Sequence, residues 1–309
     1  MFFTTLFNAR KVDYVLIDTY STYNFWYAFV VSQICILFKK PYIPILRGGD
    51  LPNWLKSSPK FSKLIFCNSL YNVAPSTYLF NIFDNLNYPN LKLIPNTIEI
   101  GNYNFLKRNE LAPKILWVRS LSVIYNPKMA IDVLAILKTS FLEAELCMVG
   151  QEKDVRIDEL KEYADSLGVN VTFTGKLSKT DWIKLSENYD IFINTTHFDN
   201  TPVSLIEALA LGLPVVTTNV GGIPYLVRDK ETALLVNDSD SQAMADAINE
   251  LIKSPELAKE LAAKKEAAGA KGSAPAHREL RLWPGRPGGQ LQPPDPRPGA
   301  QAHRRRDFP

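Results

Sequence analysis

The chain has 309 residues, of which 46% are hydrophobic and 22% charged, proportions typical of a folded, water-soluble protein with room for two α/β domains. Its formal net charge is +3, but residues 271–309 hold eight cationic and three acidic residues, a balance of +5, so the remainder carries −2. That balance excludes the basic surface expected of a nucleic-acid-binding protein.

The first 110 residues are predicted to form an N-terminal domain in which short β-rich runs alternate with helical patterns. Alternation of this kind favours parallel sheets covered by helices. The predicted strands are residues 12–18, 42–46, 64–68 and 91–95, and the predicted helices are residues 23–38 and 70–83. The helix at 23–38 contains the longest apolar stretch, about 14 residues, whereas a membrane span needs roughly 20. A polar stretch from Asn96 to Glu110 is the predicted linker.

A second series of elements predicts a complete doubly wound domain over residues 111–268. Its predicted strands are residues 115–118, 144–149, 171–174, 190–194, 214–218 and 233–236. Its predicted helices are residues 127–138, 154–167, 180–188, 202–211, 240–253 and 255–268.

Beyond residue 268 the composition changes, and eight of the chain's 21 prolines lie in residues 271–309. We predict a disordered basic tail over residues 269–309, because few apolar side chains are available to offset the cost of ordering. A tail that contacts anionic lipid or nucleic acid, or a segment that is not native sequence, remains an alternative.

Three cysteines, Cys35, Cys67 and Cys147, lie far apart without CxxC spacing, so neither a disulfide framework nor a zinc site is expected. The first residues lack the basic flank and cleavage site of a signal peptide. We therefore expect a cytoplasmic protein.

Polar residues follow several of the predicted strands of the second domain, where an open parallel sheet binds its ligands. Arg119 follows the first strand, Gly175 and Lys176 follow the third, residues 195–201 follow the fourth, and Gly221 and Gly222 follow the fifth.

The predicted helix 202–211 is apolar except for Ser204 and Glu207, which share one face. Thr201 is expected to cap this helix, with Pro202 in its first turn. A buried carboxylate needs a partner, and a ribose diol could donate both hydroxyls to Glu207. An internal ion pair or partial exposure of Glu207 is the alternative.

Gly221 and Gly222 predict a turn whose backbone N–H groups could hold phosphate, and Arg119 could bind a diphosphate with two hydrogen bonds. An ordinary glycine turn and a surface arginine are the alternatives.

These residues resemble the signature of the group 1 (family 4) glycosyltransferases. The resemblance covers roughly residues 12–268 and rests on the spacing from Asp199 to Glu207 and on four short motifs. The motifs are Ala208-Leu209-Ala210-Leu211-Gly212-Leu213-Pro214, Phe173-Thr174-Gly175, Ile115-Leu116-Trp117-Val118-Arg119 and Ile94-Pro95-Asn96-Thr97. It implies a retaining enzyme of the GT-B fold, with two Rossmann-like domains.

The resemblance also implies roles for single residues. Glu207 corresponds to the residue that binds the donor ribose, and Asp199 stands where the family usually has a glutamate that contacts the donor sugar. Arg119 corresponds to the arginine that neutralises the donor diphosphate, and Gly221 and Gly222 to glycines near the donor. No metal and no cofactor are expected, because no Asp-x-Asp pair lies on a cleft loop and GT-B relatives work without one.

Three departures from the family pattern concern the site. The family's lysine, about five residues past the arginine, is missing, and Lys128 or Lys176 is a possible replacement. Thr19 ends the strand after which the family often has a histidine. The N-terminal domain also looks short, and a missing strand and helix would leave an unpaired sheet edge and exposed apolar faces.

The resulting hypothesis is transfer of a sugar from a UDP- or GDP-sugar to a hydroxyl of a glycan or lipid-linked acceptor, in cell-surface glycan synthesis. Peripheral contact with the inner membrane face could involve Phe25, Trp26, Tyr27 and Trp54, for which core packing is the alternative role. A nucleotide-binding fragment without transferase activity is the alternative function. A nicotinamide-dependent oxidoreductase is disfavoured, because no strand is followed by Gly-x-Gly-x-x-Gly.

Overall fold

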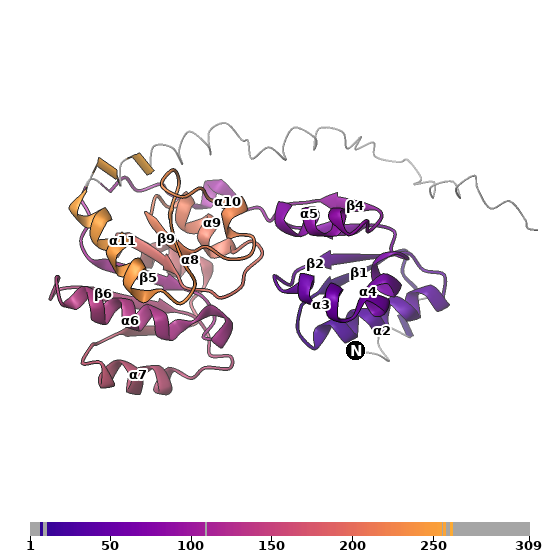
Figure 1. Ribbon diagram of the computed structural model, residues 1–309, viewed down its shortest axis with the longest axis horizontal. Helices are drawn as coiled ribbons and strands as arrows, with labels where there is room; N and C mark the ends of the chain where they lie inside the picture. Colours follow the sequence, from indigo (N-terminus) through magenta and orange to yellow (C-terminus); the bar gives the residue numbers. More distant parts are fainter. Residues whose placement is uncertain (1–6, 9–10, 109, 255, 258–259, 262–309) are drawn as a thin grey trace, which may run out of the picture. The chain divides into compact units, whose positions relative to one another are not determined.

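The computed structural model describes residues 7–8, 11–108, 110–254, 256–257 and 260–261, so the predicted tail and most of the predicted helix 255–268 lie outside the described residues. These residues form two parallel sheets with covering helices, one drawn in indigo and purple and the other in magenta to orange in Figure 1. The predicted α/β class is confirmed.

The first sheet has four parallel strands in the order β1-β2-β3-β4. They are β1 (Val15–Thr19), β2 (Tyr42–Leu46), β3 (Asn72–Ala74) and β4 (Leu91–Leu93). The helices between them are α2 (Asn24–Leu37), α3 (Leu51–Ser57), α4 (Pro59–Phe66) and α5 (Thr77–Asn85).

Two predictions in this sheet are wrong. Most of the predicted strand 64–68 lies in or directly after α4, which has proline in its first turn and buries Ser62, Ile65 and Phe66 on one face. The predicted helix 70–83 begins with β3, a strand too short to show an alternating pattern. Asn72, in β3, is buried because its amide donates to the carbonyl oxygens of Phe66 and Pro89, at 2.8 and 2.9 Å.

The second sheet has six parallel strands in the order β10-β9-β8-β5-β6-β7. They are β5 (Lys114–Val118), β6 (Glu145–Val149), β7 (Thr172–Gly175), β8 (Ile191–Asn194), β9 (Val215–Thr218) and β10 (Leu234–Val236). The helices are α6 (Pro127–Lys138), α7 (Ile157–Ser166), α8 (Lys179–Leu185), α9 (Val203–Ala210), α10 (Ile223–Leu226) and α11 (Ser241–Lys253). This strand order is the doubly wound order that the sequence predicts, and all six predicted strands are confirmed.

The second sheet is buried on both faces, because successive residues of β5 enter different cores. Ile115 and Trp117 join a cluster that includes Leu134 of α6, whereas Leu116 joins a cluster that includes Leu205 of α9. Burial on both faces explains why the strands are continuous apolar runs in the sequence.

The segment between the two sheets is anchored to the second sheet by the buried side chain of Arg108. Its guanidinium donates to the carbonyl oxygens of Tyr189 (3.0 Å), Leu211 (3.1 Å) and Ser186 (3.0 Å). Burial lowers the pKa of Arg108, and Asp190, 3.7 Å away, opposes that shift.

Strand β1 lies at one edge of the first sheet, and apolar side chains on and near it are exposed. They include Tyr14, Leu16, Tyr27, Val30 and Leu37. None of the helices within the described residues combines the length and the apolar character needed to cross a membrane.

Candidate functional site

The candidate site lies where the strand order of the second sheet reverses. Strand β5 has β6 on one side and β8 on the other, and in doubly wound sheets ligands bind beyond the carboxyl ends of such a strand pair. Arg119 directly follows β5, and residues 195–201 directly follow β8. The topology therefore brings together two segments that the sequence analysis selected separately.

Arg119 and Asp199 form an ion pair at this position. Nη2 of Arg119 donates to Oδ2 of Asp199, and both side chains are mostly buried, with 14% and 11% of their area exposed. The Arg119 guanidinium also lies over the ring of Tyr125, with its carbon 4.0 Å from the ring centroid. Nε of Arg119 is buried and has no hydrogen-bond acceptor among the described residues.

Burial raises the pKa of Asp199, while Arg119 and the backbone N–H groups of Asn200 and Thr201 oppose that shift. A carboxylate held in this way stabilises the arginine in the absence of ligand. It also leaves Nε as a buried donor available to an anion.

The loop after β8 is fixed by hydrogen bonds to the loop after β5. The indole of Trp117 donates to Oγ1 of Thr195 at 2.9 Å. That hydroxyl lies 2.8 Å from the carbonyl oxygen of Tyr125 and 2.9 Å from that of Asn126. The backbone N–H of His197 donates to the carbonyl oxygen of Ile124 at 2.9 Å. These contacts join the loop that carries Asp199 to the loop that carries Tyr125.

Glu207 is buried on α9, as expected, and its partners are protein side chains. The hydroxyl of Tyr103 donates to Oε1 at 2.7 Å, and Nζ of Lys179 lies 2.5 Å from the same oxygen. The alternative of an internal ion pair is thus present in this structure. Because both contacts use Oε1, Oε2 is the oxygen that could receive a further hydroxyl. One turn earlier, Oγ of Ser204 is buried without a partner among the described residues.

Neither partner of Glu207 was predicted from the sequence. Lys179 is mostly exposed and begins α8, and Tyr103 lies in the predicted linker, so neither carries a local signal. Glu207 raises the pKa of Lys179. Burial, and secondly the hydrogen bond to Glu207, raises the pKa of Tyr103.

Gly221 and Gly222 pack against the backbone of the Asp199 loop. A Cβ atom on Gly221 would lie 2.1 Å from the carbonyl oxygen of Asp199, and one on Gly222 would lie 1.8 Å from that of Asn200. The N–H of Gly222 donates to the carbonyl oxygen of Asp199 at 2.9 Å. In this conformation the N–H of Gly222 is therefore not free to hold phosphate, and the two glycines permit close approach of two loops.

Thr201 does not cap α9, contrary to expectation. The helix begins at Val203 after Pro202, and Oγ1 of Thr201 donates instead to the carbonyl oxygen of Pro75 at 3.3 Å. Its neighbour Asn200 donates from Nδ2 to the carbonyl oxygen of Leu46 at 3.2 Å.

Lys176 and Arg119 line the same cavity of about 290 Å³, together with Gly150, Gln151 and Trp182. Gly175, which ends β7, adopts a left-handed backbone conformation (φ 69°) and accepts a hydrogen bond from the N–H of Gly150 at 2.9 Å. Lys128 points elsewhere and lies over the ring of Tyr163, 5.1 Å from its centroid. Of the two candidate replacement lysines, only Lys176 shares a cavity with Arg119.

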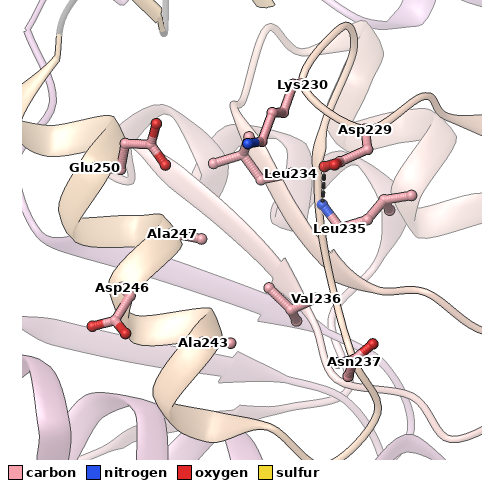
Figure 2. A pocket seen from close by; sticks show the side chains of 10 residues that line it. All are labelled: Asp229, Lys230, Leu234, Leu235, Val236, Asn237, Ala243, Asp246, Ala247 and Glu250. Carbon is pink, nitrogen blue, oxygen red and sulfur yellow. Dashed lines mark hydrogen bonds between the residues drawn. The ribbon is translucent and has the colours of Figure 1, made fainter.

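A second cavity, of about 390 Å³, lies between β10 and α11 (Figure 2). Its lining includes Asp229, Lys230, Asp246 and Glu250 and none of the residues selected from the sequence, so it is separate from the candidate site.

Comparisons with known proteins show the family and the fold of the chain. A family model described as Glycosyl transferases group 1 matches residues 103–268. The D-inositol 3-phosphate glycosyltransferase of Mycobacterium marinum is 35% identical over 99 residues, which are 31% of this chain and 21% of that protein. The match thus spans about a fifth of the curated relative.

Solved structures share the fold at low sequence identity. Anabaena HepE in complex with UDP-glucose is 18% identical, with a TM-score of 0.74 over 87% of this chain and 77% of that chain. A glycosyltransferase from Rickettsia africae is 17% identical, with a TM-score of 0.62 over 91% and 80% of the two chains. These similarities confirm the predicted GT-B fold class.

Proposed function

Because this chain belongs to the glycosyl transferases group 1, we propose that it moves a sugar from a nucleoside diphosphate sugar to an acceptor hydroxyl. The observation that carries the proposal is the buried Arg119–Asp199 pair at the carboxyl ends of β5 and β8, where a doubly wound sheet takes its ligand.

Arg119 is the residue assigned to the diphosphate. Negative charge grows on the leaving diphosphate as the bond to the sugar breaks, and a fixed guanidinium stabilises that charge. One charge-assisted hydrogen bond of this kind contributes about 1.5–3 kcal/mol. The orphaned Nε of Arg119 supports the assignment, because an anion beside Arg119 would supply the missing acceptor.

Glu207 is assigned to the ribose and Asp199 to the transferred sugar. Oε2 of Glu207 would accept a ribose hydroxyl while Tyr103 keeps Oε1 oriented. Ser204, buried one turn away, adds a hydroxyl on the same face of α9. Gly175 and Lys176 would border the nucleotide from the end of β7, and Gly221, Gly222 and Thr201 would act by holding the Asp199 loop.

We further propose that the donor carries uridine, supported by the UDP-glucose bound to the structural neighbour HepE. We also propose that transfer occurs with retention at the anomeric carbon, to a glycan or lipid-linked acceptor. The chain would act in cell-surface glycan synthesis, with peripheral contact at the inner membrane face. Phe25 is not available for lipid contact, since it is fully buried and stacks on Trp54, whereas Trp26 and Tyr27 are partly exposed.

A second candidate function is nucleotide binding without sugar transfer. It is favoured by the family match, which begins at residue 103 and so leaves the first sheet unmatched.

Calorimetric titration of UDP and GDP into the purified chain and into Glu207→Ala tests the donor site. One nucleotide should bind, and the variant should bind it at least tenfold more weakly. If neither nucleotide binds to the folded protein, the donor site is refuted. A UDP-sugar transfer assay with glycan and lipid-linked acceptors then separates transfer from binding alone.

A further inference from the structure

Tyr125 lies against Arg119 in a position that no role described so far explains. The Arg119 guanidinium carbon is 4.0 Å from the centroid of the Tyr125 ring, within the range of a cation–π contact. The site is mostly buried, and such contacts are stronger where water is excluded.

The Tyr125 ring is held by a rigid loop. The backbone N–H of Tyr125 donates to the carbonyl oxygen of Ser122 at 2.9 Å. The loop ends at Asn126, which has a left-handed backbone conformation (φ 47°) and directly precedes α6. The carbonyl oxygen of Ile124 accepts from the N–H of His197 at 2.9 Å and from Oγ1 of Thr196 at 3.1 Å. The loop after β5 is thus tied to the loop after β8, which fixes the backbone that carries the ring, and the ring itself packs against the core cluster.

Two contacts of different kinds define the orientation of the guanidinium. The Tyr125 ring covers its face, and Asp199 takes a donor on its edge. A guanidinium is planar and donates only in its own plane. Covering one face therefore leaves its remaining donors, among them the orphaned Nε, directed within that plane.

We propose that Tyr125 is a positioning residue for nucleoside diphosphate binding, whose ring fixes the plane of Arg119. This inference rests on the proposed function, which assigns the diphosphate to Arg119. The ring does the positioning and the phenolic hydroxyl has no part in it, so Tyr125→Phe is the matched control for Tyr125→Leu. Leucine keeps an apolar side chain against the core cluster that Tyr125 contacts but cannot hold a cation.

The first experiment compares two probes that differ in phosphate. The affinities of UDP and of uridine are measured for the wild type, Tyr125→Phe and Tyr125→Leu by calorimetry and saturation-transfer NMR. Tyr125→Leu should weaken UDP binding about five- to tenfold and leave uridine binding unchanged, while Tyr125→Phe stays within about twofold of the wild type for both. Equal losses for UDP and uridine, or no loss for UDP, overturn the proposal.

The second experiment needs no nucleotide. Arginine Nε–H resonances report how firmly Arg119 is held, and its signal is identified from Arg119→Lys. The Arg119 signal should sharpen or exchange faster in Tyr125→Leu but not in Tyr125→Phe, and an unchanged signal overturns the positioning role. Failure of the folded wild type to bind UDP or GDP overturns the proposed function instead, and with it the diphosphate role of Tyr125.

Discussion

Replacing Gly222 with alanine tests whether the glycine pair serves the Asp199 loop. The new Cβ would lie 1.8 Å from the carbonyl oxygen of Asn200, whereas Cβ contacts shorter than 3.0 Å essentially never occur. The two backbones must therefore separate by roughly 1.2 Å. The backbone angle at Gly222 (φ −87°) suits alanine, so the expected cost comes from this steric overlap.

The separation should affect both stability and activity. Overpacking of this kind costs about 1–3 kcal/mol of unfolding free energy. The displaced loop carries Asp199, and a misplacement of about 1 Å at a reacting centre can lower turnover about 100-fold. Gly101→Ala is the matched control, because its Cβ would meet nothing within 4 Å.

Urea unfolding and a UDP-sugar transfer or binding assay would be run on both variants. Gly101→Ala should behave as the wild type, and Gly222→Ala should lose stability and function together. A Gly222→Ala protein as stable and as active as the wild type would refute the close-approach explanation for this glycine.

Three further predictions concern other parts of the molecule. Arg119→Ala should lower turnover more than tenfold, measured by transfer from a UDP-sugar, because it removes a charge-assisted contact; an unchanged rate contradicts its diphosphate role. Arg108→Met should lower the unfolding free energy, measured in urea, by about 3 kcal/mol or more, because buried carbonyl groups lose their donors. The control Lys107→Met replaces an exposed neighbour and should leave the unfolding free energy nearly unchanged. The hydrogen bond to Asp132 raises the pKa of Tyr163 to about 12, so the folded chain keeps a proton that the unfolded chain loses near pH 10. Unfolding free energy should therefore fall as the pH rises from 10 to 12, and Tyr163→Phe should show a shallower fall in urea titrations across that range.

The second sheet could be predicted from the sequence because each of its strands is a buried apolar run that ends in polar residues. The same pattern brought Arg119 and Asp199 together, since the carboxyl ends of parallel strands meet at one edge of a sheet. In the first sheet the pattern failed at β3, where hydrogen bonds of Asn72 replace apolar burial.

The partners of Glu207 could not be predicted, because they come from positions 104 and 28 residues away along the chain. Tyr103 and Lys179 contact Glu207 only when the segment between the two sheets and α8 have packed on the second sheet, and no local sequence pattern encodes that packing. The close approach at Gly222 is hidden for the same reason, since Gly-Gly pairs are common in turns and only the tertiary structure shows which backbone lies opposite.

The anchoring of Arg108 has a practical consequence for dividing the chain. A fragment that begins at Leu111 would omit Arg108 and Tyr103, leaving the carbonyl groups of Ser186, Tyr189 and Leu211 and the carboxylate of Glu207 without these donors. Ile98 already packs against the core cluster that contains Tyr103. An expression fragment meant to isolate the second sheet should therefore start before Ile98, so that it includes the segment with Tyr103 and Arg108 that packs on this sheet.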